Sequence, residues 1–264
     1  PDVITEDWKK WWEAAKRELK KDGHFQVPLK KSEPVIYQVK EVTLQDRLLD
    51  EFRAAKGLKA RLAVVSEVLK NLADLNGKDA AVTEVITALN SDIASHQRTQ
   101  SALALEAILL RDELCQASGL PSIPGELNEA AVWAQTGKPG VLLELIPAAK
   151  HKRALQSFKE AYPERWAEVL VGSLNAVSAK LCSECAMILI NEGKLDLLKE
   201  VLARLISQHQ ASSELLLWLA KERSDSFADI LGPEVFRAML TTMERDQFNE
   251  RKSNRLRDLI LDDQ

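Results

Sequence analysis

The 264-residue sequence contains few residues that interrupt helices and few that favour sheets. It has only 10 Gly and 9 Pro, and aromatic residues make up 5% of the chain. β-Sandwiches and β-barrels need more turn residues, and more Val, Thr and Tyr, than this. Leu, Ala, Glu and Lys are abundant, and all four favour helices. The composition therefore predicts an all-α fold.

Signals for secretion or membrane insertion are also missing. No apolar run approaches the roughly 20 residues that a membrane-spanning helix needs, and no charged-then-apolar leader follows Pro1. The three cysteines are an odd number without the spacing of a disulfide framework. We therefore expect a soluble cytoplasmic protein without a membrane partner. The absence of Met at position 1, and of a helix-stop signal near the last residues, predicts a fragment of a longer chain.

Neither sign of charge dominates the whole chain. It has 36 Lys and Arg against 40 Asp and Glu, a formal net charge of -4, which argues against general nucleic-acid binding by the whole molecule. The first 31 residues differ, with eight Lys or Arg against six Asp or Glu, a local net of +2. The remainder has 28 against 34, a net of -6. Excess positive charge is therefore concentrated near the N-terminus.

Apolar residues recur at helical spacing through most of the chain, and the loops between the later helices are short. Short loops make sequential helices antiparallel neighbours, so we expect stacked antiparallel helix pairs in an irregular HEAT-like or TPR-like solenoid. The exception is at most a small β-hairpin near 25–39, where prolines interrupt the helical pattern. Pro163 and Pro233 suit first helical positions, and Gly193 suits a helix C-terminus.

A Pro- and Gly-containing segment over 119–125 is the best candidate for a domain boundary. We therefore expect three parts in the chain. Residues 1–40 should form a Trp- and Lys-rich opening helix with an extended segment. Residues 41–120 should form a helical subdomain, and residues 121–264 a helical-repeat subdomain.

The opening helix has an aromatic stripe and a basic face. At 100° per residue, one side collects Trp8, Trp11, Trp12, Ala15 and Leu19. The other side collects Lys9, Lys10, Lys16, Arg17, Lys20 and Lys21. A base-stacking platform would need both sets on one surface, so their opposite directions disfavour it. Internal packing is the favoured role of the three indoles, and contact with a partner is the alternative.

The basic face has two possible roles. It is either a solvated helix face or a contact with an acidic surface, on nucleic acid or on a partner protein. The candidate partner-binding residues are Trp8, Trp11, Trp12, Lys16, Arg17, Lys20 and Lys21.

Residues able to support catalysis or metal binding are sparse. The pair Cys182-Ser-Glu-Cys185 lacks the second ligand pair of a zinc ribbon, and Cys115 is far away in sequence. Both sulfurs of the pair fall on the expected buried face of a helix, which favours a core position over redox chemistry. No Gly-rich phosphate loop occurs, so we expect no enzyme, no metal, no other cofactor and no small-molecule ligand. The scattered histidines are expected at the surface or at helix ends: His24, His96, His151 and His209.

Several segments within residues 5–75 form a recognisable pattern. They are Asp7-Trp8-x-x-Trp11-Trp12-x-x-Ala15-x-x-x-Leu19-Lys20-Lys21-Asp22, Phe25-x-Val27-Pro28, Lys31-Ser-Glu-Pro34, Asp46-Arg47-Leu48-Leu49 and Lys56-Gly57-Leu58-Lys59-Ala60-Arg61-Leu62. The pattern resembles the long N-terminal extensions of some Gre-family transcription elongation factors. Gre factors insert a helical hairpin with acidic tip residues into the secondary channel of RNA polymerase and stimulate transcript cleavage by the polymerase's own metal site. Neither this hairpin nor the C-terminal Gre β-domain has a counterpart here, so the resemblance gives no residue a role in cleavage.

The resemblance implies a non-catalytic helical interaction or adaptor region that docks a Gre-like elongation factor on RNA polymerase or another transcription protein. Two alternatives stay open. One is a nucleic-acid-binding helical module that uses the basic face of the first helix, and the other is a general helical-repeat scaffold. A stand-alone enzyme is disfavoured because no catalytic constellation is visible.

Overall fold

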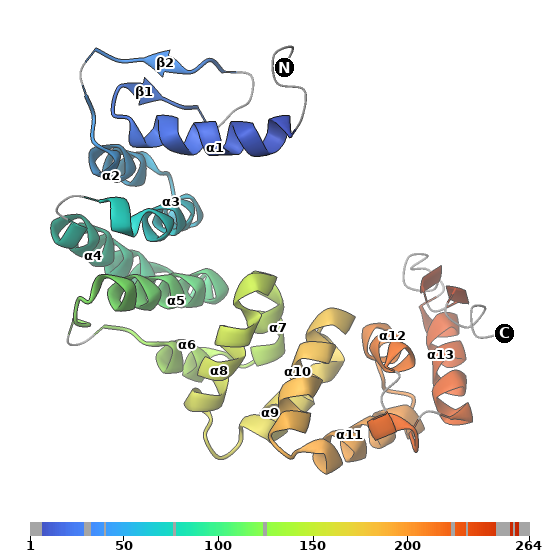
Figure 1. The fold of residues 1–264 in the computed structure, drawn as a ribbon. Helices are drawn as coiled ribbons and strands as arrows, with labels where there is room; N and C mark the ends of the chain where they lie inside the picture. Colours follow the sequence, from blue (N-terminus) through green and yellow to red (C-terminus); the bar gives the residue numbers. More distant parts are fainter. Residues whose placement is uncertain are drawn as a thin grey trace. The chain divides into compact units, whose positions relative to one another are not determined.

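A computed structural model of the chain describes residues 7–28, 33–39, 41–75, 78–123, 126–222, 225–230 and 232–246, with 254–255 and 257–258 near the C-terminus. Over these residues the protein is all-α with one two-stranded antiparallel hairpin, as predicted (Figure 1). No helix in this part of the chain combines the length and apolar character needed to cross a bilayer.

The chain divides into two compact units. One is Pro1–Ser95 with Ala107–Glu126, and the other is His96–Glu106 with Leu127–Gln264. The three parts expected from the sequence are continuous segments of the chain, whereas these two units are spatial clusters. The division into three parts therefore stays a prediction. Two residues of its proposed boundary segment, Pro124 and Gly125, lie outside the described residues.

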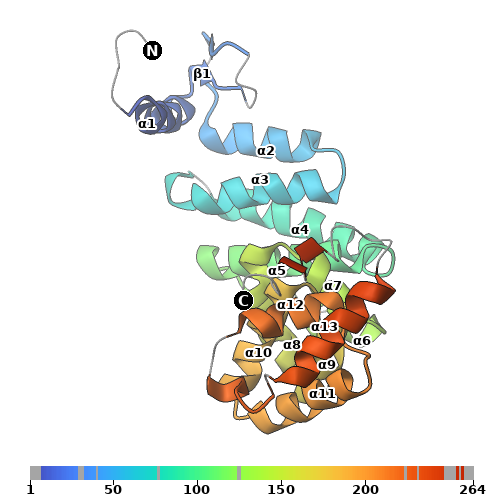
Figure 2. The same ribbon diagram turned by 90° about the vertical axis from the view of Figure 1, so that its right-hand side faces the viewer.

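The first unit combines a helix–hairpin segment with a series of further helices. Its elements are α1 (Trp8–Lys21), β1 (Phe25–Gln26), β2 (Ile36–Tyr37), α2 (Leu44–Ala54), α3 (Leu58–Lys70), the 3-10 turn η1 (Leu72–Asp74), nearly all of α4 (Lys78–His96) and the C-terminal part of α5 (Ser101–Ser118). In Figure 2, α2, α3 and α4 lie in successive layers. The hydroxyl of Thr43 accepts a hydrogen bond from the Asp46 N–H and so caps α2.

The hairpin is held close to the start of α2. Its strands pair antiparallel, with Phe25 opposite Tyr37. Gly23, just before β1, is buried, and a Cβ atom there would lie 2.7 Å from the carbonyl oxygen of Val42. Only glycine permits this approach, which lets the Val42 N–H donate to the Gly23 carbonyl at 2.9 Å. The small hairpin predicted near 25–39 is therefore confirmed.

A buried polar network crosses the first unit. Arg111 of α5 is only 2% exposed. Its Nη1 donates to Asn90 Oδ1 of α4 at 2.9 Å, and its Nε donates to Asp112 Oδ1 at 2.8 Å. Asn90 in turn donates from Nδ2 to Glu126 Oε1 at 2.7 Å. An unpaired buried charge would destabilise the fold, and these acceptors lower the cost of burying the guanidinium. The same contacts connect α4, α5 and the segment after α5.

The second unit is a series of shorter helices. They are α6 (Glu129–Gln135), α7 (Pro139–Leu145), η2 (Ala148–Lys150), α8 (His151–Ala161), α9 (Trp166–Ser173), η3 (Leu174–Ala176), α10 (Ala179–Asn191), α11 (Leu195–Ser207), α12 (Ser213–Lys221), η4 (Asp225–Phe227) and α13 (Pro233–Arg245). The even-numbered helices contact one another in sequence from α6 to α12, and the odd-numbered helices do so from α7 to α13. Alternating helices therefore form two layers.

Local signals in the sequence set several of the helix ends. Pro233 begins α13, and Gly193 follows α10 with a φ of 71°, so both predictions are confirmed. The prediction for Pro163 is wrong. The N–H of Trp166 donates to the Tyr162 carbonyl at 2.7 Å, which makes a turn of residues 163–165 and delays α9 until Trp166.

The core of the second unit includes a fully buried tryptophan. Trp133 of α6 meets Phe158 of α8 edge to face, with ring centroids 5.3 Å apart. Its Nε1 donates to the Ser157 hydroxyl at 2.9 Å, and its carbonyl accepts from the Tyr162 hydroxyl at 2.6 Å. Both polar ends of this residue are therefore satisfied by α8 and the residue that follows it.

Replacing Ser157 with Ala should destabilise the protein by about 1–3 kcal/mol, because the buried Trp133 N–H loses its acceptor. Ser207→Ala is the matched control, since that hydroxyl lies on an exposed residue and donates only to the Arg204 carbonyl. The control should change stability by less than about 0.5 kcal/mol. Urea unfolding followed by far-UV circular dichroism measures both. Equal costs for the two variants would contradict the assigned role of Ser157.

Candidate partner-binding site

Helix α1 has no buried residue, although it carries three tryptophans. Trp8 is 37% exposed and Trp11 is 45% exposed, while Trp12 is half-buried. Internal packing, the role favoured from the sequence, is therefore wrong for Trp8 and Trp11. The main contact of α1 is with β1, and a two-residue strand is too small to cover three indoles.

The three tryptophans instead stack on one another. The ring centroids of Trp8 and Trp11 are 5.2 Å apart, and those of Trp8 and Trp12 are 5.9 Å apart with nearly parallel planes. Lys16 places its Nζ 6.0 Å from the centroid of the Trp12 ring, within reach of a cation–π interaction. The aromatic and basic sides predicted to point in opposite directions therefore meet at Lys16.

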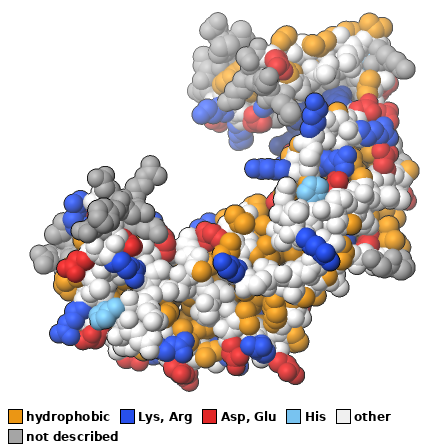
Figure 3. All heavy atoms as spheres, turned by 180° about the vertical axis from the view of Figure 1, so that it is seen from behind, with side chains coloured by type: hydrophobic (Ala, Val, Ile, Leu, Met, Phe, Trp, Pro, Cys, Tyr) orange, Lys and Arg blue, Asp and Glu red, His pale blue; other side chains and the backbone are white. Residues whose placement is uncertain are grey.

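The four candidate basic residues lie together. Lys16, Arg17, Lys20 and Lys21 line a groove of about 730 Å³ along one side of α1. We call it the α1 groove. Its other lining residues are Glu13, Val27, Leu44, Arg47, Leu48, Glu51, Ala63, Glu67, Lys70, Asn71 and Asp74, which come mainly from α2, α3 and η1. In Figure 3, Lys and Arg side chains lie among acidic ones over this part of the first unit.

Part of this positive charge is already neutralised. Lys16 pairs with Glu13, and Lys21 lies 3.6 Å from Asp74 Oδ2. Arg17 and Lys20 make no ion pair with any of the residues that the structure describes. These two cations are therefore the ones free to meet an anionic group.

Arg47 adds a cation that the sequence did not single out. Its Nη2 donates weakly to the Asp22 carbonyl at 3.5 Å. Its Nη1 is buried and has no hydrogen-bond partner among the described residues. A buried N–H group without an acceptor is costly, so an acceptor supplied in the groove would be stabilising. Only folding brings this residue of α2 beside α1, and no spacing in the sequence indicates it.

The three tryptophans are not among the residues that line the groove. The seven candidate residues therefore fall into two neighbouring surfaces joined at Lys16: a basic groove wall and an aromatic ridge. Whether either surface binds a partner stays a prediction.

The cysteines occupy core positions, as predicted. Cys182 and Cys185 of α10 are buried, and the Cys182 thiol donates to the Leu174 carbonyl at 3.3 Å. Burial raises the pKa of Cys182 to about 12 and raises the pKa of Cys185 further. Among the described residues, no group of three or more His, Cys, Asp or Glu side chains is placed to hold a metal ion.

His151 lies at a helix end, one of the two places expected for the histidines, but it is buried and hydrogen-bonded. It is buried at the start of α8, where Nδ1 lies 2.8 Å from Glu184 Oε2 and Nε2 lies 2.9 Å from the Ile146 carbonyl oxygen. Glu184 is in α10, 33 residues further along the chain. No spacing in the sequence indicates this acidic partner, because folding supplies it from the next helix of the same layer.

Comparison with known proteins places the chain in a class related to transcription elongation. Residues 1–42 match the GRAD helix-turn-helix domain, and residues 44–244 match the GreA-associated C-terminal domain. Since the second match covers most of its length, the chain belongs to the GreA-associated C-terminal domain family. The resemblance to Gre-family extensions seen in the sequence is confirmed.

One curated relative extends this finding. The chain is 24% identical over 251 residues to the transcription elongation factor GreA of Chlamydia trachomatis serovar D. The alignment covers 91% of this chain but 33% of that relative, so the chain spans about a third of the relative's length. No solved structure matches the chain.

Because Trp8 and Trp11 are exposed, changing either to Ala should destabilise the protein by less than about 1 kcal/mol. Trp133→Ala provides the buried comparison and should cost about 3–5 kcal/mol. Urea unfolding of the three single variants, followed by circular dichroism, measures the difference. If Trp11→Ala were as costly as Trp133→Ala, the aromatic ridge would belong to the core.

Burial of the thiols predicts slow chemistry at Cys182 and Cys185. The thiolate is the reactive form, and the raised pKa values keep both groups protonated in the folded protein at pH about 9, where a thiol in the unfolded chain is largely ionised. A chromogenic disulfide reagent at that pH should therefore modify them at least about a hundredfold faster in urea than in buffer. Rapid modification of both in the folded protein would place them at the surface instead.

Proposed function

We propose that this chain is a helical adaptor region that docks a Gre-related elongation factor on RNA polymerase or on an associated transcription protein. The observation that carries the proposal is the α1 groove, where cations from three helices meet beside apolar side chains. Membership of the GreA-associated family supports the transcription context, and the curated relative is itself named a transcription elongation factor. The chain covers a third of that relative, so docking is proposed for this region and not for the rest of the factor.

An acidic protein surface fits the groove best. Arg17 and Lys20 are free of ion pairs among the described residues, and Arg47 has an unused buried N–H. Carboxylates can satisfy all three, and charge-assisted hydrogen bonds to Arg are the strong ones. A partner that covered the apolar lining next to them would remove it from water, which would favour binding. Such complementarity mainly sets specificity and the rate of association.

The region is proposed to act without catalysis. The closely spaced cysteines are the residues in the sequence best suited to chemistry, and their raised pKa values hold them in the unreactive thiol form. The two layers of alternating helices support a role as a helical-repeat scaffold that carries binding surfaces.

A second candidate function, nucleic-acid binding, is favoured by the match of residues 1–42 to a helix-turn-helix domain. Such domains place a helix in the major groove of DNA. Here α1 would use its exposed Lys9 and Lys10, which do not line the α1 groove. Phosphate contacts would make binding fall steeply with salt concentration.

Two double variants with equal charge change separate these functions. The groove variant combines Arg17→Glu and Lys20→Glu, and the matched control combines Lys9→Glu and Lys10→Glu on the same helix. Neither pair of changes breaks an ion pair among the described residues, so both variants should fold. Circular dichroism and thermal melting verify this before binding is measured.

Capture of purified RNA polymerase on the immobilised chain is the first measurement. The groove variant should bind at least about tenfold more weakly than the unmodified chain, and the control should bind within about twofold. Duplex DNA binding at two salt concentrations is the second measurement. DNA binding lost in the Lys9 and Lys10 variant, together with polymerase capture unaffected by the groove variant, would replace the adaptor proposal with the second candidate. If the unmodified chain captures neither polymerase nor a transcription protein bound to it, the proposal is rejected.

A further inference from the structure

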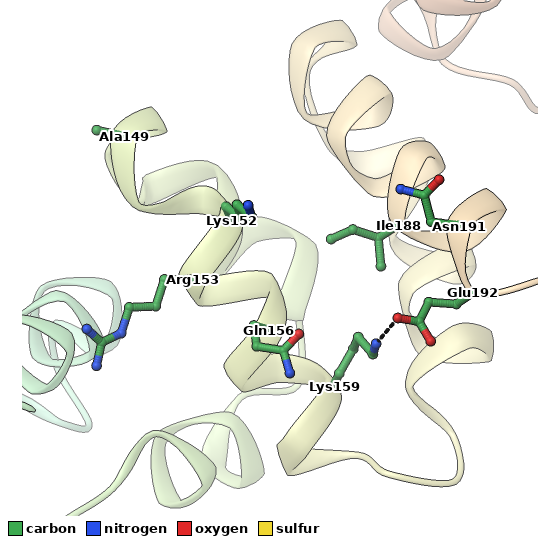
Figure 4. Close-up of a pocket in the computed structure, with 8 residues that line it drawn as sticks. All are labelled: Ala149, Lys152, Arg153, Gln156, Lys159, Ile188, Asn191 and Glu192. Atoms are coloured by element: carbon green, nitrogen blue, oxygen red, sulfur yellow. Dashed lines mark hydrogen bonds and ion pairs between the residues drawn. The ribbon is translucent and has the colours of Figure 1, made fainter.

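A second groove lies in the second unit, between the parallel helices α8 and α10. Its volume is about 520 Å³, and its lining residues are Ala149, Lys152, Arg153, Gln156, Lys159, Ile188, Asn191 and Glu192. We call it the α8–α10 groove. In Figure 4, Lys152 and Lys159 lie on the side of α8 that faces α10, Ile188 points back toward α8, and the side chain of Arg153 extends from α8 away from α10. The groove belongs to neither the α1 site nor any residue set predicted from the sequence.

Two polar contacts between α8 and α10, which we call polar ties, fix the width of this groove. At one end His151 meets Glu184, and at the other end Lys159 pairs with Glu192. Both ties join residues 33 positions apart, and they are eight residues apart along each helix. At 1.5 Å per residue the ties are about 12 Å apart, and their order shows that α8 and α10 run in the same direction. The groove therefore has walls held at both ends, and its length fits an extended segment of about four residues.

Some cations of the groove are already in ion pairs, and others are not. Lys159 is held by Glu192 and lies 5.0 Å from the centroid of the Trp166 ring, so it belongs to the framework. Lys152 and Arg153 are exposed and make no ion pair among the residues that the structure describes. Among the eight lining residues, Glu192 is the sole acidic group, and its charge cancels that of Lys159. Lys152 and Arg153 then give the groove a net charge of +2. An anionic occupant is therefore favoured.

The apolar lining decides which kind of anion fits. Ile188 offers carbon surface across the groove from Lys152, and Ala149 is a further apolar lining residue. A phosphate backbone would contact the cations but would leave this carbon surface unburied. An extended peptide alternates its side chains every residue, so an acidic side chain at one position and an apolar one nearby can satisfy both features.

We propose that the α8–α10 groove binds an acidic linear segment of a partner protein, with a carboxylate at Lys152 and an apolar side chain over Ile188. Arg153 adds positive charge on the opposite side of α8 and makes no contact with the segment. The His151–Glu184 and Lys159–Glu192 ties preform the site, so the protein pays little ordering entropy on binding. This site is independent of the α1 groove and of docking on polymerase.

Fluorescence anisotropy with a defined probe tests the proposal on the full chain. The probe is a fluorescein-labelled peptide of alternating Asp and Leu. Two comparison peptides replace every Asp with Asn, or every Leu with Ser. Lys152→Glu removes the proposed cation, and Lys180→Glu is the matched control, since Lys180 is exposed on α10 but does not line the groove.

Saturable binding of the Asp–Leu peptide is expected, weakened at least about tenfold by Lys152→Glu and less than about twofold by Lys180→Glu. Both comparison peptides should bind at least about fivefold more weakly, because each lacks one of the two contacts. Ile188→Ser should reproduce the loss seen on replacing Leu with Ser. Absence of saturable binding at low salt overturns the proposal, as does equal weakening by the two Lys variants. Full displacement of the peptide by single-stranded DNA would also overturn it, in favour of a phosphate-binding surface.

Discussion

Helices too short to be stable alone are the constraint on which the second unit depends. Helices α6 and α7 have 7 residues each, and the longest of the later ones, such as α10 and α11, have 13. Isolated helices below about 12–15 residues are marginal in water, so each of these must bury one face against its neighbours. In α11 this face is Leu198, Leu202 and Ile206, all buried at helical spacing. Packing in two layers of alternating helices follows from this need.

Apolar packing alone would leave the register between helices loosely defined. Hydrogen bonds between neighbouring helix pairs define this register. Asn175 shows the pattern: its Nδ2 donates to the Gln210 carbonyl at 2.8 Å, and its Oδ1 accepts from the Ser212 N–H at 2.6 Å. Similarly, the Ser178 N–H donates to Glu144 and the Ala179 N–H donates to Glu214. Each of these hydrogen bonds spans about one helix pair in the sequence. Because such bonds are directional, they favour one alignment of neighbouring pairs, and a groove such as that between α8 and α10 has a defined shape.

The sequence predicted features that depend on local pattern and missed those that depend on neighbours distant in the chain. Helical periodicity sufficed for the all-α fold and for the burial of Cys182 and Cys185, since the buried face of one helix is encoded within it. The same reasoning misplaced Trp11, because its burial depends on how large the facing surface is, and that surface is a hairpin with two-residue strands. The burial of His151 and its contact with Glu184 were not predicted, because Glu184 comes from the next helix of its layer.

The candidate site illustrates the same division. The basic character of α1 is visible in its sequence, but which of its cations are available is not. That depends on acids from elsewhere in the fold, such as Asp74 near Lys21, and on Arg47, which α2 brings into the groove. Pattern alone ranks Lys16, Arg17, Lys20 and Lys21 equally, whereas the structure leaves Arg17 and Lys20 without ion pairs among the described residues.

The exposure of α1 has a thermodynamic consequence. A 14-residue helix without a buried residue gains little from packing, and its stability rests on stacked indoles, on ion pairs such as Lys16–Glu13, and on its contact with the hairpin. Any partner that binds this ordered form and not a frayed one stabilises it by mass action. The same linkage also lowers affinity. When α1 is ordered in only a fraction of the molecules, the apparent affinity for the partner falls to that fraction of the affinity of the ordered form. Affinity at the α1 groove and the stability of α1 are therefore coupled, and changes to the tryptophans can alter binding without touching the groove wall.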